Sequence, residues 1–274
     1  MPEGPEIRLA ADKIAKVIEG KQIDNIEVGL PHLYQGAERL KGHMVSHVET
    51  RGKAMLIHFN NQLSIYSHNQ LYGVWMTAKR GEMPNTKRSL RLALHTAEQS
   101  ALLYSASDIG IYQLKELDEH PFLRKIGPDI LQPNLTWQTI RDRLLSKRFC
   151  NRSVSALYLD QHYIAGIGNY IRSEILFAAG IHPDYKPKQL SEKQVAELAK
   201  QTLLISKRAY ETKGHTVPNA LAKKLAKTKG SYESVRFMAF NREEQPCRQC
   251  VSPIVKAQRN GRRIYWCEIC QPLV

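Results

Sequence analysis

Close to its end the chain reads CRQCVSPIVKAQRNGRRIYWCEIC (residues 247–270), and this stretch specifies a small structure of its own. Two Cys-x-x-Cys pairs, Cys247/Cys250 and Cys267/Cys270, are separated by 16 residues. Pairs with this spacing can place four thiolates at the corners of a tetrahedron, the arrangement that structural Zn2+ takes, and they leave no ligand position open for catalysis. We therefore predict one structural zinc ion held by these four cysteines.

The residues between the two cysteine pairs predict a β-hairpin. Asn260-Gly261 is a strong signal for a two-residue hairpin turn. Arg259, Arg262 and Arg263 lie around this turn, where they are either ordinary surface charges or a means of gripping phosphate, since the planar guanidinium group suits bidentate contact with an anion. Taken alone, the hairpin favours nucleic-acid binding without specifying any chemistry.

Upstream of the hairpin the sequence pattern is helical from about residue 118. Helices are expected over residues 136–146, about 153–162, 170–180 and 191–211. The last of them opens with Ser191 and with Gln194 three positions on, which is a capping box. Residues 213–232 contain five lysines and no acidic residue, and we expect a solvated connection with a short helix in it. The single Cys150 is expected to be a core thiol.

The first part of the chain combines one helix with β-type runs. Apolar residues at helical spacing between Pro5 and Gly20 predict an amphipathic N-terminal helix. From residue 22 to about residue 106 the pattern changes to short β-type runs, for example at residues 44–50, 54–59, 63–68, 90–96 and 101–107. Several short strands with one flanking helix indicate a β-sandwich or barrel-like domain.

Composition narrows the class of protein. The chain has 274 residues, with 40 Lys+Arg against 26 Asp+Glu and a formal net charge of +14. This excess favours a polyanionic partner and argues against an acidic or neutral metabolic enzyme, while 42% hydrophobic residues argue against a disordered basic tail. No apolar run approaches ~18 residues and the first residues do not form a signal peptide, so we expect no membrane association and a cytoplasmic, nucleoid-associated location.

The chain begins with MPEGPE, in which two carboxylates follow a proline. Removal of Met1 would expose the secondary amine of Pro2 beside Glu3 and Glu6. A secondary amine that attacks a sugar C1′ gives a cationic iminium directly, and an α-amino pKa of about 7.7–8.0 leaves a useful neutral fraction at physiological pH. By itself this beginning is common and identifies nothing.

The separate motifs together closely resemble the formamidopyrimidine-DNA glycosylase/endonuclease VIII family over nearly the whole chain. They are, in order, MPEGPEI (1–7), ETRGKAML (49–56), HNQLYG (68–73), HPFLRKIGPD (120–129), GIGNYIRSEIL (166–176) and the four-cysteine finger. The resemblance implies an α+β multidomain fold, with an N-terminal helix and β-sandwich (1–124), a helix-two-turn-helix DNA-binding domain (125–232) and a zinc finger (233–274).

The same resemblance implies a bifunctional enzyme of base excision repair. The enzyme would be a DNA glycosylase and AP lyase, acting on double-stranded DNA that contains oxidised bases or abasic sites. Since each chain carries one catalytic set of residues, we expect a monomer.

Matched position by position, the resemblance assigns catalytic roles. It makes Pro2 the Schiff-base nucleophile and Glu3 the acid/base that protonates the sugar oxygen or departing base. Glu6 would orient the site, Lys53 would contact phosphate near the lesion and assist elimination, and Arg262 would grip the phosphates flanking the flipped nucleotide. The negative charge of Glu6 would also interact favourably with the positive, N-terminal end of the dipole of the predicted first helix.

Further residues match DNA contacts of the family. Asn169 in the GIGN turn would bind phosphate, helped by the amides of the helix start. Lys125 stands where relatives usually carry an arginine, so the charge is kept but the bidentate geometry is not. Arg263 is an alternative to Arg262 as the residue of the finger that contacts phosphate. The residues expected to fill the gap left by the extruded nucleotide are Gln70, Leu71 and Tyr72.

Two other functions remain open. One is the oxidised-purine branch of the same family, which removes formamidopyrimidine or 8-oxoguanine. Gly4 and the Gln-Leu-Tyr set instead favour oxidised pyrimidines, namely thymine glycol, dihydrouracil and 5-hydroxycytosine. The other alternative is a non-catalytic zinc-ribbon DNA-binding protein, which does not account for Pro2, Glu3, Glu6 and Lys53 occurring together.

Overall fold

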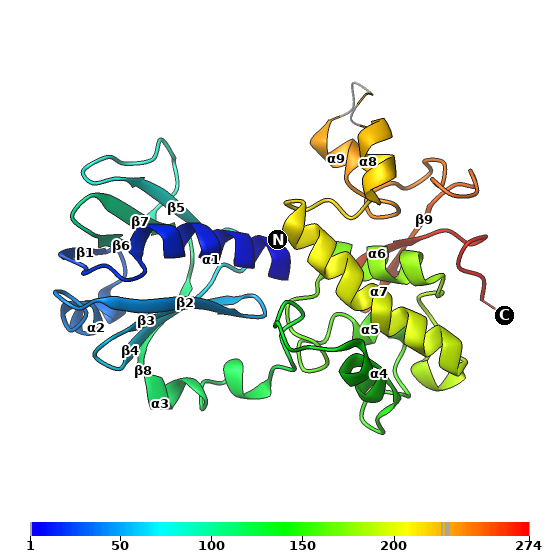
Figure 1. The fold of residues 1–274 in the computed structure, drawn as a ribbon, viewed down its shortest axis with the longest axis horizontal. Coiled ribbons are helices and arrows are strands. Elements are labelled where there is room, and N and C mark those ends of the chain that lie inside the picture. The colour runs from blue at the N-terminus through cyan, green and yellow to red at the C-terminus, as the bar shows by residue number, and fades with distance from the viewer. Residues whose placement is uncertain (1, 226, 228–230, 274) are drawn as a thin grey trace. The chain divides into compact units, whose positions relative to one another are not determined.

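The computed structural model describes residues 2–225, 227 and 231–273, and it divides into two compact units (Figure 1). The first unit is Pro2 with Glu6–Lys125, and the second is Glu3–Pro5 with the chain from Ile126 onward. Within the described residues, no helix combines the length and the apolar character needed to cross a membrane.

The first unit is a β-sandwich of two antiparallel four-stranded sheets, which confirms the predicted fold class. One sheet has the order β1-β6-β7-β5, with β1 (Asn25–Val28), β6 (Leu90–His95), β7 (Gln99–Tyr104) and β5 (Val74–Lys79). The other has the order β2-β3-β4-β8, with β2 (Val45–Arg51), β3 (Ala54–Phe59), β4 (Leu63–His68) and β8 (Asp108–Gln113).

The core of this unit is apolar and includes one face of the N-terminal helix α1 (Gly4–Ile18). Ile14 and Ile18 lie one turn apart on α1 and are almost completely buried. They belong to the same buried cluster as Ile57 of β3, Ile65 of β4 and Leu103 of β7. The predicted amphipathic helix is therefore confirmed, and burial of its apolar stripe is the physical reason that it forms.

The strands β3 and β4 are buried on both faces, unlike ordinary sandwich strands. The chain after β8, with α3 (Leu114–Leu117) and η2 (Leu123–Lys125), supplies the cover. The His120 ring lies 4.2 Å from the Tyr66 ring, and the Phe122 ring lies 5.4 Å from the His68 ring, between centroids. This cover explains why residues 54–59 are almost uniformly apolar rather than alternating.

Some local predictions in this unit are incomplete. The strands β1 and β5 lie within the predicted β-type stretch but were not singled out, whereas η1 (Pro31–Leu33), α2 (Tyr34–Glu38) and the strand β8 were not predicted. The strand expected over 101–107 ends at Tyr104, because Ser105 adopts a left-handed conformation (φ 53°).

The second unit is mainly helical. Its helices are α4 (Trp137–Leu145), α5 (Val154–Leu157), α6 (Asn169–Ala179), η3 (Pro187–Gln189), α7 (Glu192–Glu211), α8 (Asn219–Leu225) and α9 (Tyr232–Val235). The capping box is confirmed, since Ser191 N donates to Gln194 Oε1 at 2.9 Å and Gln194 N donates to Ser191 Oγ at 3.3 Å. The α6 helix ends at Gly180 in the left-handed conformation (φ 66°), as its sequence predicts.

Two predictions in this unit are wrong. The helix expected near 153–162 is only the short α5, because Asp160 turns the chain by accepting a hydrogen bond from the amide of His162 at 2.9 Å. Cys150 is half-buried rather than a core thiol. In residues 213–232 the expected short helix is α8, whereas 226 and 228–230 lie outside the described residues.

The β-hairpin of β9 (Val255–Arg259) and β10 (Arg262–Trp266) shares its core with the helices. Ile264 and Trp266 belong to one buried cluster with Ile171 and Ile175 of α6. The packing of these side chains fixes the start of α6 relative to the hairpin within this unit.

Candidate functional site

The side chain of Glu3 lies against the first turn of α6. Its Oε2 accepts hydrogen bonds from the amides of Gly168 (2.8 Å) and Ile171 (3.3 Å), and its Oε1 accepts one from the amide of Tyr170 (2.9 Å). The residue is only 4% exposed. The first amides of a helix lack partners within the helix and carry partial positive charge, so a carboxylate there is both bound and stabilised.

One backbone hydrogen bond and one glycine also determine how closely the chain around Glu3 approaches α6. The amide of Gly4 donates to the carbonyl of Gly166 at 2.8 Å. A Cβ on Gly168 would lie 2.3 Å from Cδ of Glu3, so only glycine allows this close approach. The GIGN turn therefore supplies one amide and the space for the carboxylate, and the first turn of α6 supplies the other two amides.

Asn169, the first residue of α6, is held by Arg172 one turn later. Arg172 Nη2 donates to Asn169 Oδ1 at 2.7 Å and to the carbonyl of Arg263 at 2.8 Å, and Nη1 donates to the carbonyl of Ser155 at 2.8 Å. Because guanidinium only donates, it engages the oxygen of the Asn169 carboxamide and leaves the nitrogen end as a donor suited to an anion.

Arg172 is completely buried, and burial lowers its pKa to about 10, with a smaller lowering from Arg262 and an opposing effect of Glu3. The guanidinium thus remains protonated at neutral pH. The sequence pattern did not single out this residue. The available signal was an arginine within the otherwise apolar helix 170–180, where a charged side chain needs several acceptors.

Glu174 is a second buried ion that the sequence analysis did not select. Its carboxylate accepts hydrogen bonds from the amides of Met238, Ala239 and Phe240, each at 2.8 Å, and from the hydroxyl of Thr216. These contacts fasten α6 to the segment that leads into the cysteine module.

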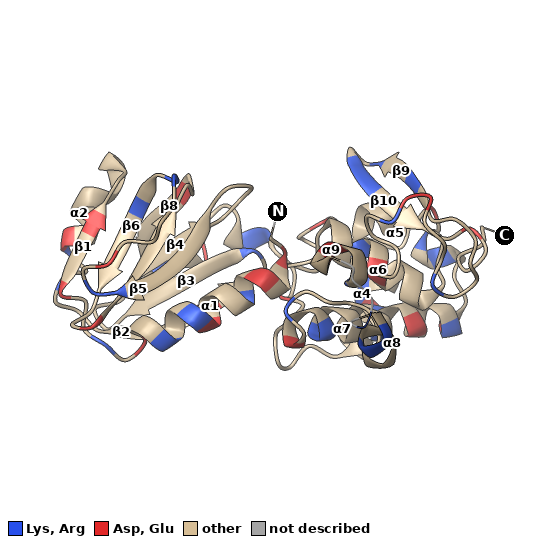
Figure 2. Ribbon diagram, turned by 90° about the horizontal axis from the view of Figure 1, so that it is seen from above, with Lys and Arg blue, Asp and Glu red and all other residues tan. Residues whose placement is uncertain are grey.

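The basic hairpin has the geometry that its sequence predicts. Asn260 and Gly261 both have positive φ (54° and 71°), as a two-residue turn of type I′ requires. Arg259 is engaged by Asp184, with Nε–Oδ1 and Nη2–Oδ2 distances of 2.9 and 3.0 Å. Arg262 and Arg263 are exposed, and Figure 2 shows the concentration of basic residues on β9 and β10. Of the three arginines, these two remain as candidate anion contacts.

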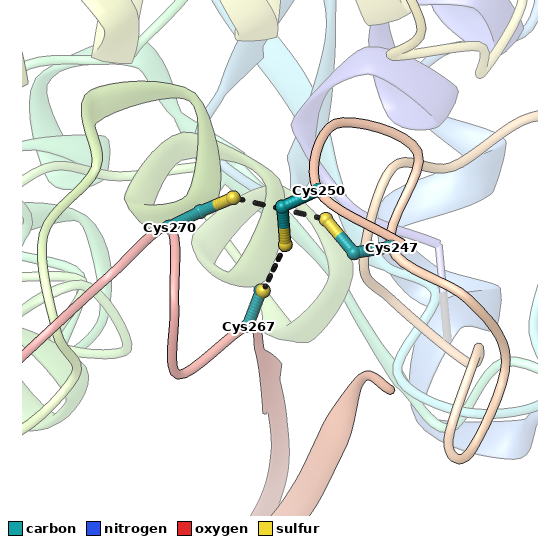
Figure 3. Close-up of side chains that lie close together, drawn as sticks. All are labelled: Cys247, Cys250, Cys267 and Cys270. Carbon is teal, nitrogen blue, oxygen red and sulfur yellow. Dashed lines mark hydrogen bonds between the residues drawn. The ribbon is translucent and has the colours of Figure 1, made fainter. Parts of the chain in front are cut away.

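The four cysteines come together at the base of the hairpin (Figure 3). Their sulfur atoms all lie within 4.8 Å of one another, with 3.8 Å between Cys247 and Cys270 and 3.3 Å between Cys250 and Cys267. A tetrahedral site with Zn–S bonds of about 2.3 Å has sulfur atoms roughly 3.8 Å apart. The set of four sulfur donors therefore fits one metal ion.

In the first unit, the loop after β4 projects two large apolar side chains. Leu71 is 53% exposed and Tyr72 is 67% exposed. The backbone beneath them is well braced, since Gln70 N donates to His68 Nδ1 at 3.1 Å and Ser107 Oγ donates to Gln70 Oε1 at 3.0 Å. Exposed apolar side chains on a fixed loop are suited to insertion into a partner.

Lys53 lies in the turn between β2 and β3 and interacts electrostatically with His68. His68 thus interacts with Lys53 and also accepts the hydrogen bond from the amide of Gln70. Lys125 is exposed in η2, and Glu6 lies in the first turn of α1. Pro2 is half-buried directly ahead of Glu3, while Met1 lies outside the described residues.

The structure therefore brings together Glu3 and Asn169 at the start of α6, joins Asn169 to Arg263 through Arg172, and assembles the four cysteines. In the first unit it groups Lys53 with the Gln70 loop.

Comparison with known proteins gives two family matches. Residues 1–107 match the formamidopyrimidine-DNA glycosylase N-terminal domain, and residues 126–220 match the formamidopyrimidine-DNA glycosylase H2TH domain. Endonuclease 8 from Escherichia coli O9:H4 (strain HS) is 46% identical over 271 residues, covering 99% of this chain and 100% of the relative. Endonuclease 8 from Shigella sonnei (strain Ss046) has the same identity and coverage.

Solved structures show a similar fold at lower sequence identity. A complex of Lactococcus lactis Fpg (MutM) with DNA containing N7-benzyl-Fapy-dG has a TM-score of 0.82 and 22% identity, covering 99% of this chain and 100% of that one. A complex of the Lactococcus lactis Fpg with DNA containing an abasic site has a TM-score of 0.81, 21% identity and the same coverage.

Proposed function

Because the chain belongs to the formamidopyrimidine-DNA glycosylase/endonuclease VIII family, whose members are DNA glycosylases with AP lyase activity, we propose that it removes oxidised pyrimidines from double-stranded DNA through a Schiff base on Pro2. The observation that carries this proposal is the fixed carboxylate of Glu3, which three amides of the α6 start hold directly after the candidate nucleophile. Thymine glycol, dihydrouracil and 5-hydroxycytosine are the proposed lesions.

The proposed chemistry starts at the nitrogen of Pro2, after removal of Met1. This nitrogen forms a bond to C1′ of the damaged nucleotide as the bond from C1′ to the base breaks, and the departing base takes a proton from solvent. The Glu3 carboxylate accepts the proton that the nitrogen then loses and passes it to O4′ as the bond from C1′ to O4′ breaks, which leaves the opened sugar as an iminium. Loss of the C2′ proton then breaks the bond from C3′ to its phosphate oxygen. A second elimination breaks the bond at C5′, and water releases the sugar fragment from Pro2, which leaves a one-nucleotide gap with phosphates at both ends.

Other residues hold the nucleic acid in place in this proposal. Lys53 contacts phosphate near the lesion and assists elimination, and Glu6 orients the reacting groups. Asn169 donates its carboxamide nitrogen to a phosphate, a role supported by the grip of Arg172 on the carboxamide oxygen. Arg262 is the proposed finger contact, supported by its exposure and its electrostatic interaction with Arg172.

Extrusion of a nucleotide costs a few kcal/mol of stacking and pairing energy. We propose that Gln70, Leu71 and Tyr72 occupy the vacated space. The exposure of Leu71 and Tyr72 supports this assignment, and one aromatic ring stacked on a base contributes roughly 1–3 kcal/mol. Lys125 and Arg263 are proposed as further phosphate contacts.

The metal in this proposal is one structural zinc ion on Cys247, Cys250, Cys267 and Cys270. Bound there, zinc would stabilise the hairpin that carries the two exposed arginines. We further propose three functional domains, 1–124, 125–232 and 233–274, in a monomer that works on DNA in the cytoplasm.

Borohydride trapping tests the nucleophile. The protein is incubated with duplexes that contain thymine glycol, 5-hydroxycytosine or 8-oxoguanine, borohydride is added, and peptide mass spectrometry locates any adduct. The expected result is a stable protein–DNA adduct on Pro2 with the two oxidised pyrimidines. Absence of an adduct on Pro2 would overturn the mechanism, whereas faster processing of 8-oxoguanine would place the chain in the oxidised-purine branch.

A variant with one glycine inserted between Met1 and Pro2 is the matched control. It places an amide where the free amine would be, so it should form no adduct and cleave no DNA, while its affinity for an uncleavable abasic-site analogue stays within a few-fold of the wild-type value. Unchanged lyase turnover would contradict the assignment of Pro2.

A further inference from the structure

The hairpin of β2 and β3 carries a second group of metal-ligand side chains, distant in sequence from the cysteines. His47, Glu49 and His58 each present one ligand atom, and these atoms all lie within 4.8 Å of one another. The β-sheet register explains their proximity. His47 pairs with His58 across the two strands, and Glu49 lies two residues after His47, so all three side chains point to the same face of the sheet.

The two imidazole rings are stacked, with centroids 4.2 Å apart and an interplanar angle of 18°. His58 Nε2 lies 3.3 Å from Glu49 Oε1. Ligand atoms of a tetrahedral zinc site with bonds of about 2.0–2.1 Å are roughly 3.3 Å apart. The nitrogen–oxygen separation already has this value, whereas the two near-parallel rings must turn toward each other to direct both nitrogen lone pairs at one ion.

Each of the three side chains also has a further hydrogen-bonding partner, which for Glu49 engages the same oxygen that faces His58. His58 Nδ1 lies 2.8 Å from Ser64 Oγ, and His47 Nδ1 lies 3.3 Å from Ser46 Oγ. Arg51 Nε donates to Glu49 Oε1 at 3.0 Å. Metal-binding histidines typically hold their second nitrogen in a hydrogen bond, and metal-binding carboxylates are hydrogen-bonded as well. These partners engage Nδ1 of both histidines, whereas Nε2 of His58 faces Glu49 Oε1, where a cation would take the place of the proton between them.

We propose that His47, Glu49 and His58 bind a second zinc ion, in addition to the ion on the four cysteines. Two imidazoles and one carboxylate are a donor set that zinc accepts, with a fourth position left to water. Glu19 adds negative charge, since it interacts electrostatically with His47 and accepts a hydrogen bond from the amide of Val48 at 3.1 Å.

Arg51 is the charge that opposes a cation here, and it limits the affinity. Its guanidinium is shared with Asp118, whose Oδ1 lies 3.3 Å from Nη1. This second carboxylate partly offsets the repulsion. The site is therefore expected to bind zinc more weakly than the four thiolates and to exchange it with solution.

The position of the site gives it a structural consequence. The ion would tie β2 to β3 toward the end of the hairpin opposite the turn that carries Lys53, so occupancy would stiffen this hairpin. The link to Lys53 rests on the proposed function, whereas binding of the ion does not.

Metal content tests the proposal directly. Untagged protein that retains its finger zinc is equilibrated with a small excess of zinc, passed through a desalting column equilibrated at the same free zinc concentration, and analysed by mass spectrometry for metal. The expected result is one more equivalent of zinc in the wild-type protein than in His47→Ala or Glu49→Gln. His43→Ala is the matched control, because His43 lies just ahead of β2 outside the cluster and should retain the extra equivalent. Equal zinc content in all four proteins would overturn the proposal.

Cobalt provides a second readout. Co2+ added to the zinc-loaded wild-type protein should give a visible absorption band without the near-ultraviolet thiolate band, and His47→Ala should lose this band. A thiolate band in its place would show exchange at the cysteines and would refute a separate site. Neither measurement involves DNA, so failure of the second zinc site is distinguishable from failure of the proposed glycosylase mechanism.

Discussion

The carboxyl group of Glu3 occupies the space in which a side chain at Gly168 would begin. A Cβ on Gly168 would lie 2.3 Å from Cδ of Glu3, while the Gly168 amide donates to Glu3 Oε2 at 2.8 Å. The two residues are 165 positions apart in the chain. The conformation of the GIGN turn and the orientation of the candidate acid are therefore one structural feature.

Gly168→Ala should displace the Glu3 carboxylate from the amides of α6. The methyl group requires a shift of more than 1 Å, and misplacement of a reacting group by this distance typically costs about 10²-fold in rate. We expect excision of thymine glycol to fall by about this factor while cleavage of a preformed abasic site is largely kept. Single-turnover kinetics on the two substrates measure the difference, and equal rates for variant and wild type would contradict it.

Glu3→Gln should separate base excision from strand cleavage. Glutamine cannot supply the proton, so excision should fall by about 10²–10⁴-fold, the usual contribution of a general acid or base. The substitution also places the NH2 group of glutamine opposite a backbone amide, so two donors face each other, because both oxygens of Glu3 accept hydrogen bonds in the wild-type protein. Glu6→Gln serves as the comparison and should have a smaller effect on excision; a preformed abasic site cleaved as slowly as the lesion would argue against this role for Glu3.

Arg172→Met should act through Asn169. Without the guanidinium, the Asn169 carboxamide loses the partner that directs its nitrogen toward a phosphate. Affinity for an abasic-site duplex should fall by about 10-fold or more, since a hydrogen bond to a charged group contributes about 1.5–3 kcal/mol. The slope of log affinity against log salt should stay unchanged, because it counts cationic contacts with phosphate and the carboxamide is neutral. Fluorescence anisotropy at several salt concentrations measures the affinity and the slope.

Asn169→Ala and the double variant complete that experiment. The double variant should bind no more weakly than the weaker single variant, because both changes remove the same contact. Arg172→Lys should restore part of the affinity, since lysine keeps the charge but not the fork of donors. Additive losses would show that Arg172 and Asn169 affect binding independently, which would contradict the prediction.

The stability of the first unit should fall on acidification because of His68. Burial lowers the pKa of His68, Lys53 lowers it further, and Asp108 acts in the opposite direction. The unfolded chain then binds more protons than the native one between the folded pKa and about 6.5, so the free energy of unfolding rises with pH through this range. Each unit of lowering corresponds to at most about 1.4 kcal/mol.

His68→Asn should reduce the difference in unfolding free energy between pH 7.5 and pH 5.5, measured by urea titration. Asparagine offers an oxygen to the amide of Gln70 without taking up a proton. His43→Asn is the matched control and should keep the wild-type pH dependence. An unchanged pH dependence in His68→Asn would refute the role of this histidine.

Loss of the finger metal should abolish DNA binding while the β-sandwich stays folded. Apparent zinc affinities of comparable sites correspond to about 10–16 kcal/mol, so Cys267→Ser, which removes one thiolate ligand, should release the ion and unfold the hairpin. Zinc content and binding to an abasic-site duplex measure the two effects. Cys150→Ser should retain both, because Cys150 lies outside the four-sulfur cluster; full binding by metal-free Cys267→Ser would contradict the prediction.

Structure carried by neighbouring residues could be predicted from the sequence. The Ser191–Gln194 cap, the Asn260-Gly261 turn and the Cys-x-x-Cys pairs all formed as expected, because their geometry is set within a few bonds. The helix expected near 153–162 is shorter than predicted, because the side chain of Asp160 accepts a hydrogen bond from the amide of His162, which a continued helix would use. The spacing of apolar residues contains no information about this competition.

The sequence by itself therefore determined the β-type and helical regions of the chain, the cysteine cluster and the family. Only the tertiary structure decided which distant groups meet: the carboxylate of Glu3 with the amides of α6, Arg172 with the carbonyl of Arg263, and His47 with His58. The physical reason is that these contacts depend on strand register and on the packing of apolar cores. Strand register and core packing are properties of the folded chain as a whole, so they cannot be read from a local pattern of residues.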